Sequence, residues 1–490
     1  MPAKASTSRR KSARPVWDGV PASKPVRARY DIAYTTSENE NLWKYTDALS
    51  AAQANTPAVR KTIRQRARYE VANNSFADGI VETLSNDIVG SEVQLQLGDT
   101  DAAQRAEDAF ARWASAVRLW EKVRTAVRAK TVDGEVFGLE TTNRAVPGDI
   151  KLDLRLIECD QIESYYTGQA IKRSDEIDGI RFDADMNPTE YRVLKYHPGD
   201  YRINLAKSGG DWINARYVRH LFTATRPGQV RGVSELLPAL SLFGELRLYT
   251  KAVLNSASRA AEVSGIVYTD MIPGEEMPTM AAGTEIEIVR NSLLSLPENW
   301  KLSQLKAEQP TTTYEMFRKA ILNEIARCIN MPYNIAACDS SGYNYASGRL
   351  DHQTYDRSIE VSRADLRAQM LDPILAAWLS EYASQNALSA AQIRELSDHE
   401  WHFSQRDHVD PAKEANADHV RFLNGSLTKA AYYAKRGKDW KREERQRIRE
   451  LIESEKLWNE ERKAAGLEPA AYPHTDMGAI PKAPEGDPDE

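Results

Sequence analysis

The chain of 490 residues has only three cysteines and has no apolar run long enough to span a membrane. Cys159, Cys328 and Cys338 share no metal-ligand spacing and imply no disulfide framework, which fits a reducing compartment. The basic N-terminus lacks the apolar stretch of a secretory signal. We therefore expect a soluble protein that works or assembles in a cytoplasm, without a membrane.

Motifs that bind nucleotides or activate a serine are also missing. The sequence has no G-x-x-x-x-G-K-[ST] loop, no G-x-G-x-x-G after a strand and no G-x-S-x-G elbow. The chain is therefore not expected to be an ATP-driven motor itself. Its formal charge of -6 argues against a protein that coats DNA electrostatically, because such proteins carry a basic excess.

The sequence is organised around residues 226–355. A helical period of apolar or small residues predicts one long helix from Ser234 to Val263, about 45 Å in length. Ser234 is the expected N-cap, and the helix dipole favours Glu235 beside it. The second half of the helix is rich in small residues, which allows close packing against identical neighbours.

A β-like insert follows this helix, with GIVYTD and GTEIEIV between prolines and glycines. It is too short for an independent domain, so we expect it at the far end of a helical hairpin that Thr311–Ile329 closes. The polar loop DSSGYNYASG (Asp339–Gly348) comes next. A helix is predicted over Arg349–Leu379, with a bend at Asp372-Pro373.

Upstream, the sequence predicts an α+β domain. Two helical stretches cover residues 56–87 and end at Gly90, and helices are also expected over Ala102–Ala116 and Trp120–Lys130. Strand-like runs are SEVQLQL, EVFGLETT, KLDLRLIECDQIES, GIRFD and TEYRVLKYH. This order differs from the alternation of a βαβ nucleotide fold.

Arg60, Arg64 and Arg68 lie four residues apart, so they share one helix face. Such a face can bind phosphate or form ion pairs with Glu residues of a neighbouring element or subunit. In an acidic protein, ion pairs are the preferred interpretation.

Histidines and acids are concentrated between His399 and Asp410. The six residues are His399, Glu400, His402, Asp407, His408 and Asp410. Such groups can bind a divalent metal, as a nuclease requires. Their spacing matches no established ligand pattern, and Trp401 and Phe403 alternate like a half-buried extended segment, so a structural role is preferred and no metal or cofactor is expected.

Six stretches, in order, resemble the lambda family of tailed-bacteriophage portal proteins, the head-to-tail connectors. They are YDIAYTTSENENLW, RARYEVANNSFADGIVETLSNDIVG, LRLIECDQIES, HLFTATRPGQVRGVSELLPAL, INMPYNIAACDSSGYNYASGRLDHQTY and VDPAKEANADHVRFLNGSLT. The insert MIPGEEMPTMAAGTEIEIV resembles the family only loosely. The resemblance covers about Tyr30 to Ile452.

The resemblance implies an α+β portal fold that assembles into a ring, usually of twelve subunits, with long channel-lining helices. Its parts would be a disordered basic tail (1–29), wing (30–233), first stem helix (234–263), clip (264–310), second stem helix (311–330), tunnel-loop region (331–348), connecting helix (349–398), crown helices (399–465) and a disordered acidic tail (466–490).

The same resemblance implies a non-enzymatic channel at one capsid vertex for packaging and exit of double-stranded DNA. Expected partners are the terminase large subunit, a major capsid or scaffold protein and a head-completion adaptor. The expected location is the virion, with assembly in the host cytoplasm. The residues expected at the DNA are Asp339, Ser340, Ser341, Gly342, Tyr343, Asn344, Tyr345 and Arg349 of the tunnel loop. Glu245, Lys251 and Arg259 of the stem are candidates to line the channel, and salt bridges between subunits are an equally favoured interpretation of Lys251 and Arg259. The alternative from another class is a metal-dependent nuclease that uses His399–Asp410. A second alternative is a purely structural connector without DNA contact.

Overall fold

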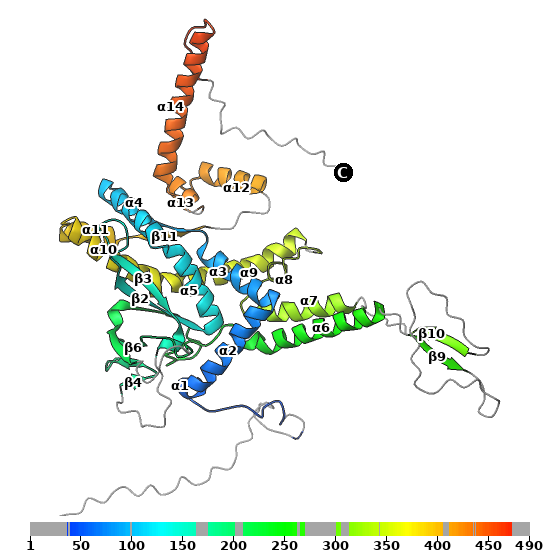
Figure 1. Cartoon of the computed structure of the whole chain (residues 1–490). Helices are drawn as coiled ribbons and strands as arrows, with labels where there is room; N and C mark the ends of the chain where they lie inside the picture. Colours follow the sequence, from blue (N-terminus) through cyan, green and yellow to red (C-terminus); the bar gives the residue numbers. More distant parts are fainter. Residues whose placement is uncertain are drawn as a thin grey trace, which may run out of the picture. The chain divides into compact units, whose positions relative to one another are not determined.

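The computed structural model of the chain is shown in Figure 1. It describes residues 40–98, 100–162, 175–200, 209–261, 265–269, 300–304, 313–342, 344–404, 411–434 and 438–472, together with residues 37 and 436. Residues 1–50 and 51–490 form two separate units. The predicted tail 1–29 and residues 473–490 of the predicted acidic tail lie outside the described residues.

Five helices begin the second unit. They are α1 (Ala51–Ala54), α2 (Pro57–Asn73), α3 (Ser75–Val89), α4 (Asp101–Ala116) and α5 (Leu119–Asp133). Polar side chains begin three of them, because Thr56, Asn74 and Thr100 each accept a hydrogen bond from a backbone N–H of the first turn. Asn74 also ends α2, which confirms two helical stretches. Gly90, at φ 76°, ends α3 as predicted.

Two antiparallel sheets follow these helices. One has the order β3-β2-β8, from β2 (Glu135–Thr142), β3 (Leu152–Ile157) and β8 (Val218–Phe222). The other has the order β4-β5-β6-β7, from β4 (Glu176–Ile177), β5 (Ile180–Phe182), β6 (Pro188–Leu194) and β7 (Gly210–Asn214). The architecture is mixed α+β, as predicted. The strands β4, β7 and β8 were not predicted.

A buried ionic joint connects this sheet region to the segment that leads into α6. The Arg231 guanidinium donates to the Glu135 carboxylate from Nε at 2.9 Å and from Nη2 at 2.6 Å, and both side chains are almost fully buried. Burial alone would raise the pKa of Glu135, but Arg231 and His220 hold it well below its usual range. A Cβ on Gly232 would lie 2.0 Å from the Gly134 carbonyl oxygen, so only glycine fits this contact.

The long helix of the predicted hairpin is α6 (Leu240–Ala261), and a 3-10 turn over Leu237–Ala239 precedes it. The prediction that Ser234 is the N-cap is therefore wrong. Ser234 is buried, and its hydroxyl donates to the Thr131 carbonyl oxygen at 3.3 Å. Glu235 accepts from Lys130 Nζ at 2.6 Å, so tertiary contacts hold both residues ahead of the helix.

The return helix is α7 (Thr313–Arg327), which confirms the predicted pair. Between the two helices, β9 (Gly265–Thr269) and β10 (Trp300–Gln304) pair antiparallel, with Gly265 opposite Gln304. This strand pair confirms the β-like character of the insert for GIVYT. The other predicted strand, GTEIEIV, lies outside the described residues.

Three helices follow α7: α8 (Tyr333–Ala336), α9 (Tyr345–Leu366) and α10 (Asp372–Gln385). A π-helical turn over Arg367–Leu371 joins α9 to α10, at the bend predicted for Asp372-Pro373. Pro373 has no N–H to continue the α-helical ladder, and the π-turn accommodates this interruption. The short α11 (Ala390–Ser397) leads to β11 (Glu400–Phe403), which pairs antiparallel with β1 (Val93–Gln96).

The last described elements are α12 (Pro411–Leu423), α13 (Lys429–Ala434) and α14 (Trp440–Ala464). The region for which the resemblance implies crown helices therefore contains three described helices after the strand β11. Asp439 caps α14, because its carboxylate accepts a hydrogen bond from the Arg442 backbone N–H. No helix in the described ranges is long and apolar enough to cross a membrane.

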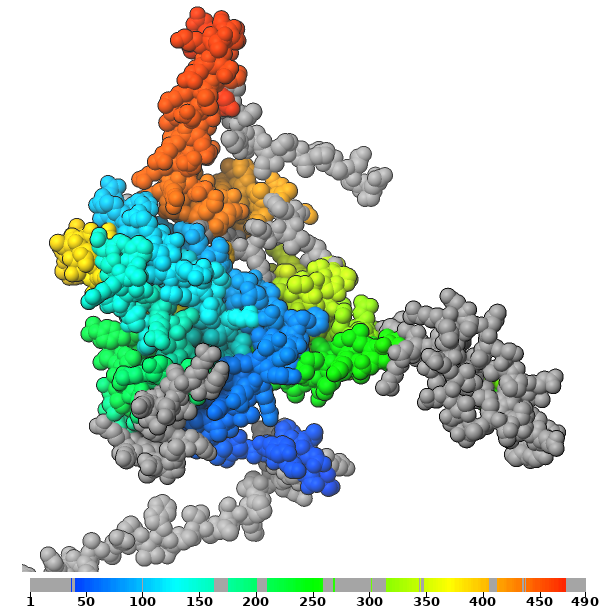
Figure 2. Space-filling view, viewed as in Figure 1, coloured from blue at the N-terminus to red at the C-terminus, as the bar shows by residue number. Residues whose placement is uncertain are grey.

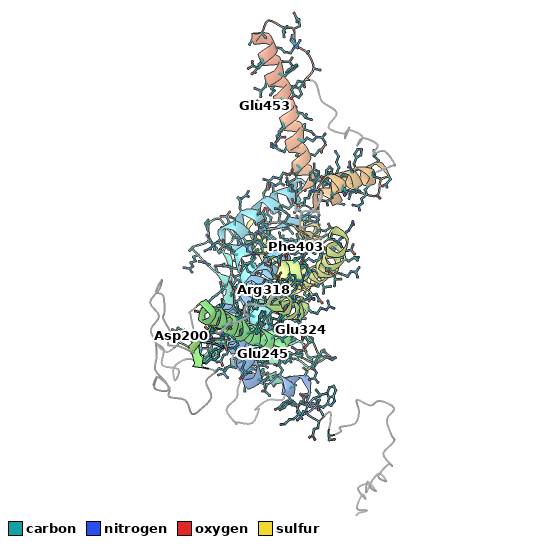
Figure 3. All side chains as sticks on the ribbon, turned by 90° about the vertical axis from the view of Figure 1, so that its right-hand side faces the viewer. Asp200, Glu245, Arg318, Glu324, Phe403 and Glu453 are labelled. Atoms are coloured by element: carbon teal, nitrogen blue, oxygen red, sulfur yellow. The ribbon has the colours of Figure 1, made fainter. Side chains whose placement is uncertain are left out.

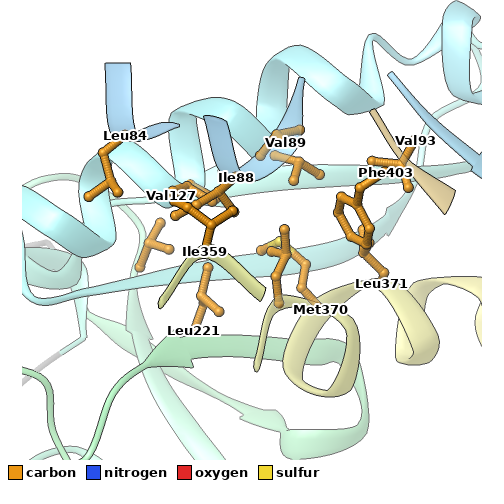
Figure 4. Close-up of a cluster of buried hydrophobic side chains, with 14 of the residues drawn as sticks. Leu84, Ile88, Val89, Val93, Val127, Leu221, Ile359, Met370, Leu371 and Phe403 are labelled. Carbon is orange, nitrogen blue, oxygen red and sulfur yellow. The ribbon is translucent and has the colours of Figure 1, made fainter. Parts of the chain in front are cut away.

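One core joins segments that are far apart in the sequence. Figure 4 shows Leu84 and Ile88 of α3 beside Val127, Leu221 and Ile359, which come from α5, β8 and α9. An aromatic cluster extends this core: the Phe110 ring lies 5.2 Å from Trp378 and 5.7 Å from Trp401. The same core includes Phe243 of α6 and Leu322 of α7, so long-range packing supports the base of the α6–α7 pair.

Candidate channel elements and nucleic-acid contacts

The α6–α7 pair is buried at its base and exposed along its length. Phe243 and Leu246 of α6 and Leu322 and Ile325 of α7 belong to the core. Farther along, the ring of Tyr249 lies 5.7 Å from Tyr314 and 4.8 Å from Phe317. These aromatic contacts hold the two helices together beyond the core.

The predicted stem residues lie on α6. Glu245 and Lys251 are exposed and have no ion-pair partner in the described part of the chain. Arg259 is in α6, but its side chain lies outside what the structure describes. Figure 3 labels Glu245 on α6 and Arg318 and Glu324 on α7, so charges of both signs occur along the pair.

A tight turn after α7 leads to the predicted loop. Asn330 has φ 57°, and the Met331 N–H donates to the Ala326 carbonyl oxygen at 3.0 Å, which closes the end of the helix. Tyr333 is buried at the start of α8, and Lys319 Nζ of α7 lies 5.1 Å from its ring centroid. The sequence analysis did not identify this anchor, and lysine–tyrosine pairs 14 positions apart give no recognisable pattern.

The loop itself is organised by Asp339. Its Oδ1 accepts hydrogen bonds from the Ser341 backbone N–H at 2.9 Å and from the Ser341 hydroxyl at 2.6 Å. These bonds lower the pKa of Asp339, so the carboxylate stays charged. Gly342 has φ +75°, a conformation that favours glycine. The first half of the loop therefore has a defined turn.

The second half of the predicted loop is helical. Helix α9 begins at Tyr345, and the Gly348 N–H donates to the Asn344 carbonyl oxygen at 3.0 Å. The prediction that the loop extends to Gly348 is therefore wrong. Among the described residues, Ser340, Ser341, Gly342, Asn344 and Arg349 are exposed. Tyr343 and the side chain of Tyr345 lie outside the described residues.

The described histidines of the stretch His399–Asp410, the alternative metal site, have different partners. The Nε2 of His399 lies 3.1 Å from Asp372 Oδ1, which also accepts from Trp401 Nε1 at 2.8 Å. His402 Nε2 instead lies 2.8 Å from Gln96 Oε1 across the β1–β11 pair. Trp401 and Phe403 are buried, so the predicted half-buried extended segment is confirmed. Asp407, His408 and Asp410 lie outside the described residues.

The predicted arginine face of α2 is occupied by carboxylates of the same chain. Arg60 lies 3.0 Å from Asp178, and Arg64 lies 2.9 Å from Asp160. Arg68 contacts Asp133 at 2.6 Å, Glu158 at 2.9 Å and Asp160 at 3.0 Å. The ion-pair interpretation is confirmed, although most partners are aspartates.

His197 lies beside two of these acids, 3.4 Å from Glu158 and 3.7 Å from Asp160. Three such groups resemble a metal site in composition. Arg64 and Arg68 already neutralise the two carboxylates, so the arrangement is an ion-pair network.

Sequence comparison gives the family. A sequence model described as "Phage portal protein, lambda family" matches residues 39–363. A relative from Halomonas phage phiHAP-1, described as "Probable portal protein", is 23% identical over 394 residues, covering 73% of each chain.

Solved structures are more distant. The chain is similar to one in the "neck of native GTA particle computed with C12 symmetry", with TM-score 0.45, 15% identity and coverage of 77% of this chain and 92% of that chain. It is also similar to an HK97-family phage portal protein from Corynebacterium diphtheriae, with TM-score 0.28, 13% identity and coverage of 74% and 98%. Both TM-scores are low, so the family assignment depends on the sequence match. Since that match covers most of the chain and ends within α9, this protein belongs to the lambda family of phage portal proteins.

Proposed function

We propose that this protein forms a ring of twelve subunits at one vertex of a phage capsid. The ring is the channel through which double-stranded DNA enters during packaging and leaves at infection. It also docks the terminase large subunit, a major capsid or scaffold protein, a head-completion adaptor and, later, tail proteins. As a portal protein the chain is structural and not an enzyme.

The observation that best supports assembly into a ring is that the α6–α7 pair exposes large apolar side chains. Leu248 and Leu254 on α6 are each 64% exposed, and Met316 and Phe317 on α7 are 65% and 48% exposed. A folded helix pair with such a surface is typical of an interaction site. Neighbouring copies would cover these side chains, and a heterologous contact that repeats by rotation closes into a ring.

The parts of the chain then take the following roles. Residues 30–233 form the wing, α6 and α7 the stem, and the insert with β9 and β10 the clip. The turn at Asp339–Asn344 is the tunnel loop, α9 to α11 form the connecting region, and α12 to α14 form the crown. In this arrangement the protein resides in the virion, after assembly in the host cytoplasm.

The channel must let DNA slide. Phosphate contacts create affinity, whereas acidic walls repel the duplex. The formal charge of -6 fits a conduit of this kind. We assign the approach to DNA to the exposed turn Ser340–Gly342 and to Asn344 and Arg349, and we place Glu245, Lys251 and Arg259 along the stem.

The test of the ring is the native mass and electron micrographs of the purified full-length protein. A large ring with a central hole is expected, and a stable monomer at assembly concentrations would overturn the proposal. A Leu248→Glu, Met316→Glu variant is expected to prevent ring formation, because each carboxylate would have to be desolvated in the subunit contact.

The test of the tunnel loop replaces residues 339–344 with a Gly/Ser linker. We expect intact rings but impaired packaging or genome retention. The matched control replaces Asn424–Ser426, another exposed turn, with the same kind of linker. Normal packaging and full genome retention in the loop variant would contradict the role of the loop.

A further inference from the structure

Residues 421–449, which include the first part of α14, carry a net positive charge, although the whole chain is acidic. This segment has ten basic residues and three acidic ones. The next twelve positions, Glu450–Glu461, hold five acids and one lysine. The boundary falls within α14, which Figure 2 shows in orange and red, and Glu453, labelled in Figure 3, lies in the acidic half.

Several of the basic residues are used in ion pairs within this region. Lys429 contacts Glu444 at 2.9 Å, Lys438 contacts Glu443 at 3.1 Å, and Arg436 contacts Asp418 at 3.5 Å. Arg442, Arg445 and Arg449, in contrast, are exposed, and none of them has an ion-pair partner in the ranges that the structure describes.

The three arginines share one face of α14. Their spacing of three and four residues places them on consecutive turns, over about 10 Å of helix. Trp440, Glu444 and Leu451, which are partly buried, occupy the opposite side. Contacts such as Lys429–Glu444 hold that opposite side against α13, so the arginine face points away from it.

We propose that Arg442, Arg445 and Arg449 bind the phosphates of duplex DNA. A guanidinium group presents a planar fork of donors that matches phosphate oxygens. One DNA strand carries a phosphate about every 3.4 Å of axis, so about three phosphates lie along the length of this face. The acidic half of α14 would repel the same duplex, which limits contact to the base of the helix.

The choice of DNA over an acidic protein rests on the proposed function, because a portal handles duplex DNA. The site itself is separate from the α6–α7 pair and from the turn at Asp339–Asn344. It would bind packaged DNA outside the channel, where affinity for DNA does not slow the movement of DNA through the channel.

The test compares two triple variants of the full-length protein. R442Q/R445Q/R449Q removes the proposed site. K456Q/R462Q/K463Q removes the same formal charge from the other half of the same helix and is the matched control. Native mass first establishes that each variant forms the same assembly as the unchanged protein. Binding of a short random-sequence duplex is then measured by fluorescence anisotropy over a series of salt concentrations.

We expect R442Q/R445Q/R449Q to bind DNA at least about tenfold more weakly at low salt. The slope of log affinity against log salt should become shallower by about 2 to 3, because three phosphate contacts are lost. The control should keep nearly the original affinity and slope.

Equal DNA affinity in the two variants would overturn the inference. So would unchanged DNA binding by R442Q/R445Q/R449Q together with failure to enter capsids, which would assign the face to an acidic protein partner. Neither result concerns ring formation. Failure of the unchanged protein to form a ring would instead count against the proposed function.

Discussion

Two helices of this protein, α2 and α14, each have three arginines on one face. The arginines of α2 are paired with carboxylates of the same chain, whereas those of α14 are exposed. On α2, Arg60 and Arg64 are almost fully buried, and Arg68 is about one-third exposed, with every guanidinium beside a carboxylate. On α14, the face formed by Arg442, Arg445 and Arg449 is exposed. The residue type and the helical spacing are nearly the same.

The difference comes from what each helix packs against. The acids that meet α2 come from the end of α5, the segment after β3 and the turn between β4 and β5, namely Asp133, Asp160 and Asp178. A buried guanidinium without such partners would carry a large desolvation cost. On α14 the packed side is the opposite one, so water solvates the arginines. Arginine spacing therefore predicts a shared face, and the neighbours decide between a structural ion pair and a binding surface.

The largest expected effect is on stability at α2. Arg64→Ala should lower the free energy of unfolding by about 2 kcal/mol, because it leaves the partly buried Asp160 with fewer partners. The loss is smaller than for a fully buried pair, since Arg68 remains 3.0 Å from Asp160. Urea unfolding followed by circular dichroism measures the change.

The matched substitution on α14 is Arg445→Ala. It should change the free energy of unfolding by less than about 0.5 kcal/mol, as is usual at exposed positions. Equal losses from the two substitutions would remove the distinction between the faces.

A second prediction uses acid pH. Burial alone would raise the pKa of Asp160, but Arg64 and Arg68 outweigh burial and lower it. Because the pKa in the folded state is below that of the unfolded chain, the contribution of Asp160 is present above about pH 4 and is lost as the pH falls further. Asp160→Asn should therefore make the urea midpoint less sensitive to pH below about pH 4.

The reference for this prediction is the unchanged protein over the same pH series, in which the other carboxylates still titrate. An Asp160→Asn variant that loses stability as steeply as the unchanged protein would show that Asp160 does not contribute. The arginines of the α14 face have no ion-pair partner in the described chain, so this face should add no such acid-dependent loss.

The smallest expected effect tests whether the arginines of the α14 face can form ion pairs, as those of α2 do. Arg445→Glu places a carboxylate three residues after Arg442 and four before Arg449, which favours pairs worth about 0.3–0.5 kcal/mol each on an exposed helix. Thermal unfolding should show a small gain or no change relative to Arg445→Gln. A marked loss of stability would mean that the arginine already has a structural contact.

Local sequence patterns correctly predicted the α+β class, the N-terminal helices and the α6–α7 pair. They failed where distant residues decide the local structure. Ser234 has the composition of an N-cap, but Thr131 binds its hydroxyl and the helix begins at Leu240. The short strands β4, β7 and β8 have weak alternation, and pairing with β5, β6 and β2 gives them their structure.

The sequence by itself determined the family of this protein, its element types and the residues that share each helix face, because these depend on neighbours a few positions apart. Only the tertiary structure decided which charged faces remain available. The aspartates that occupy the α2 face lie 65 to 118 positions away from their arginines, and chain folding alone brings them within 3.0 Å. The same packing turns the arginine face of α14 away from α13.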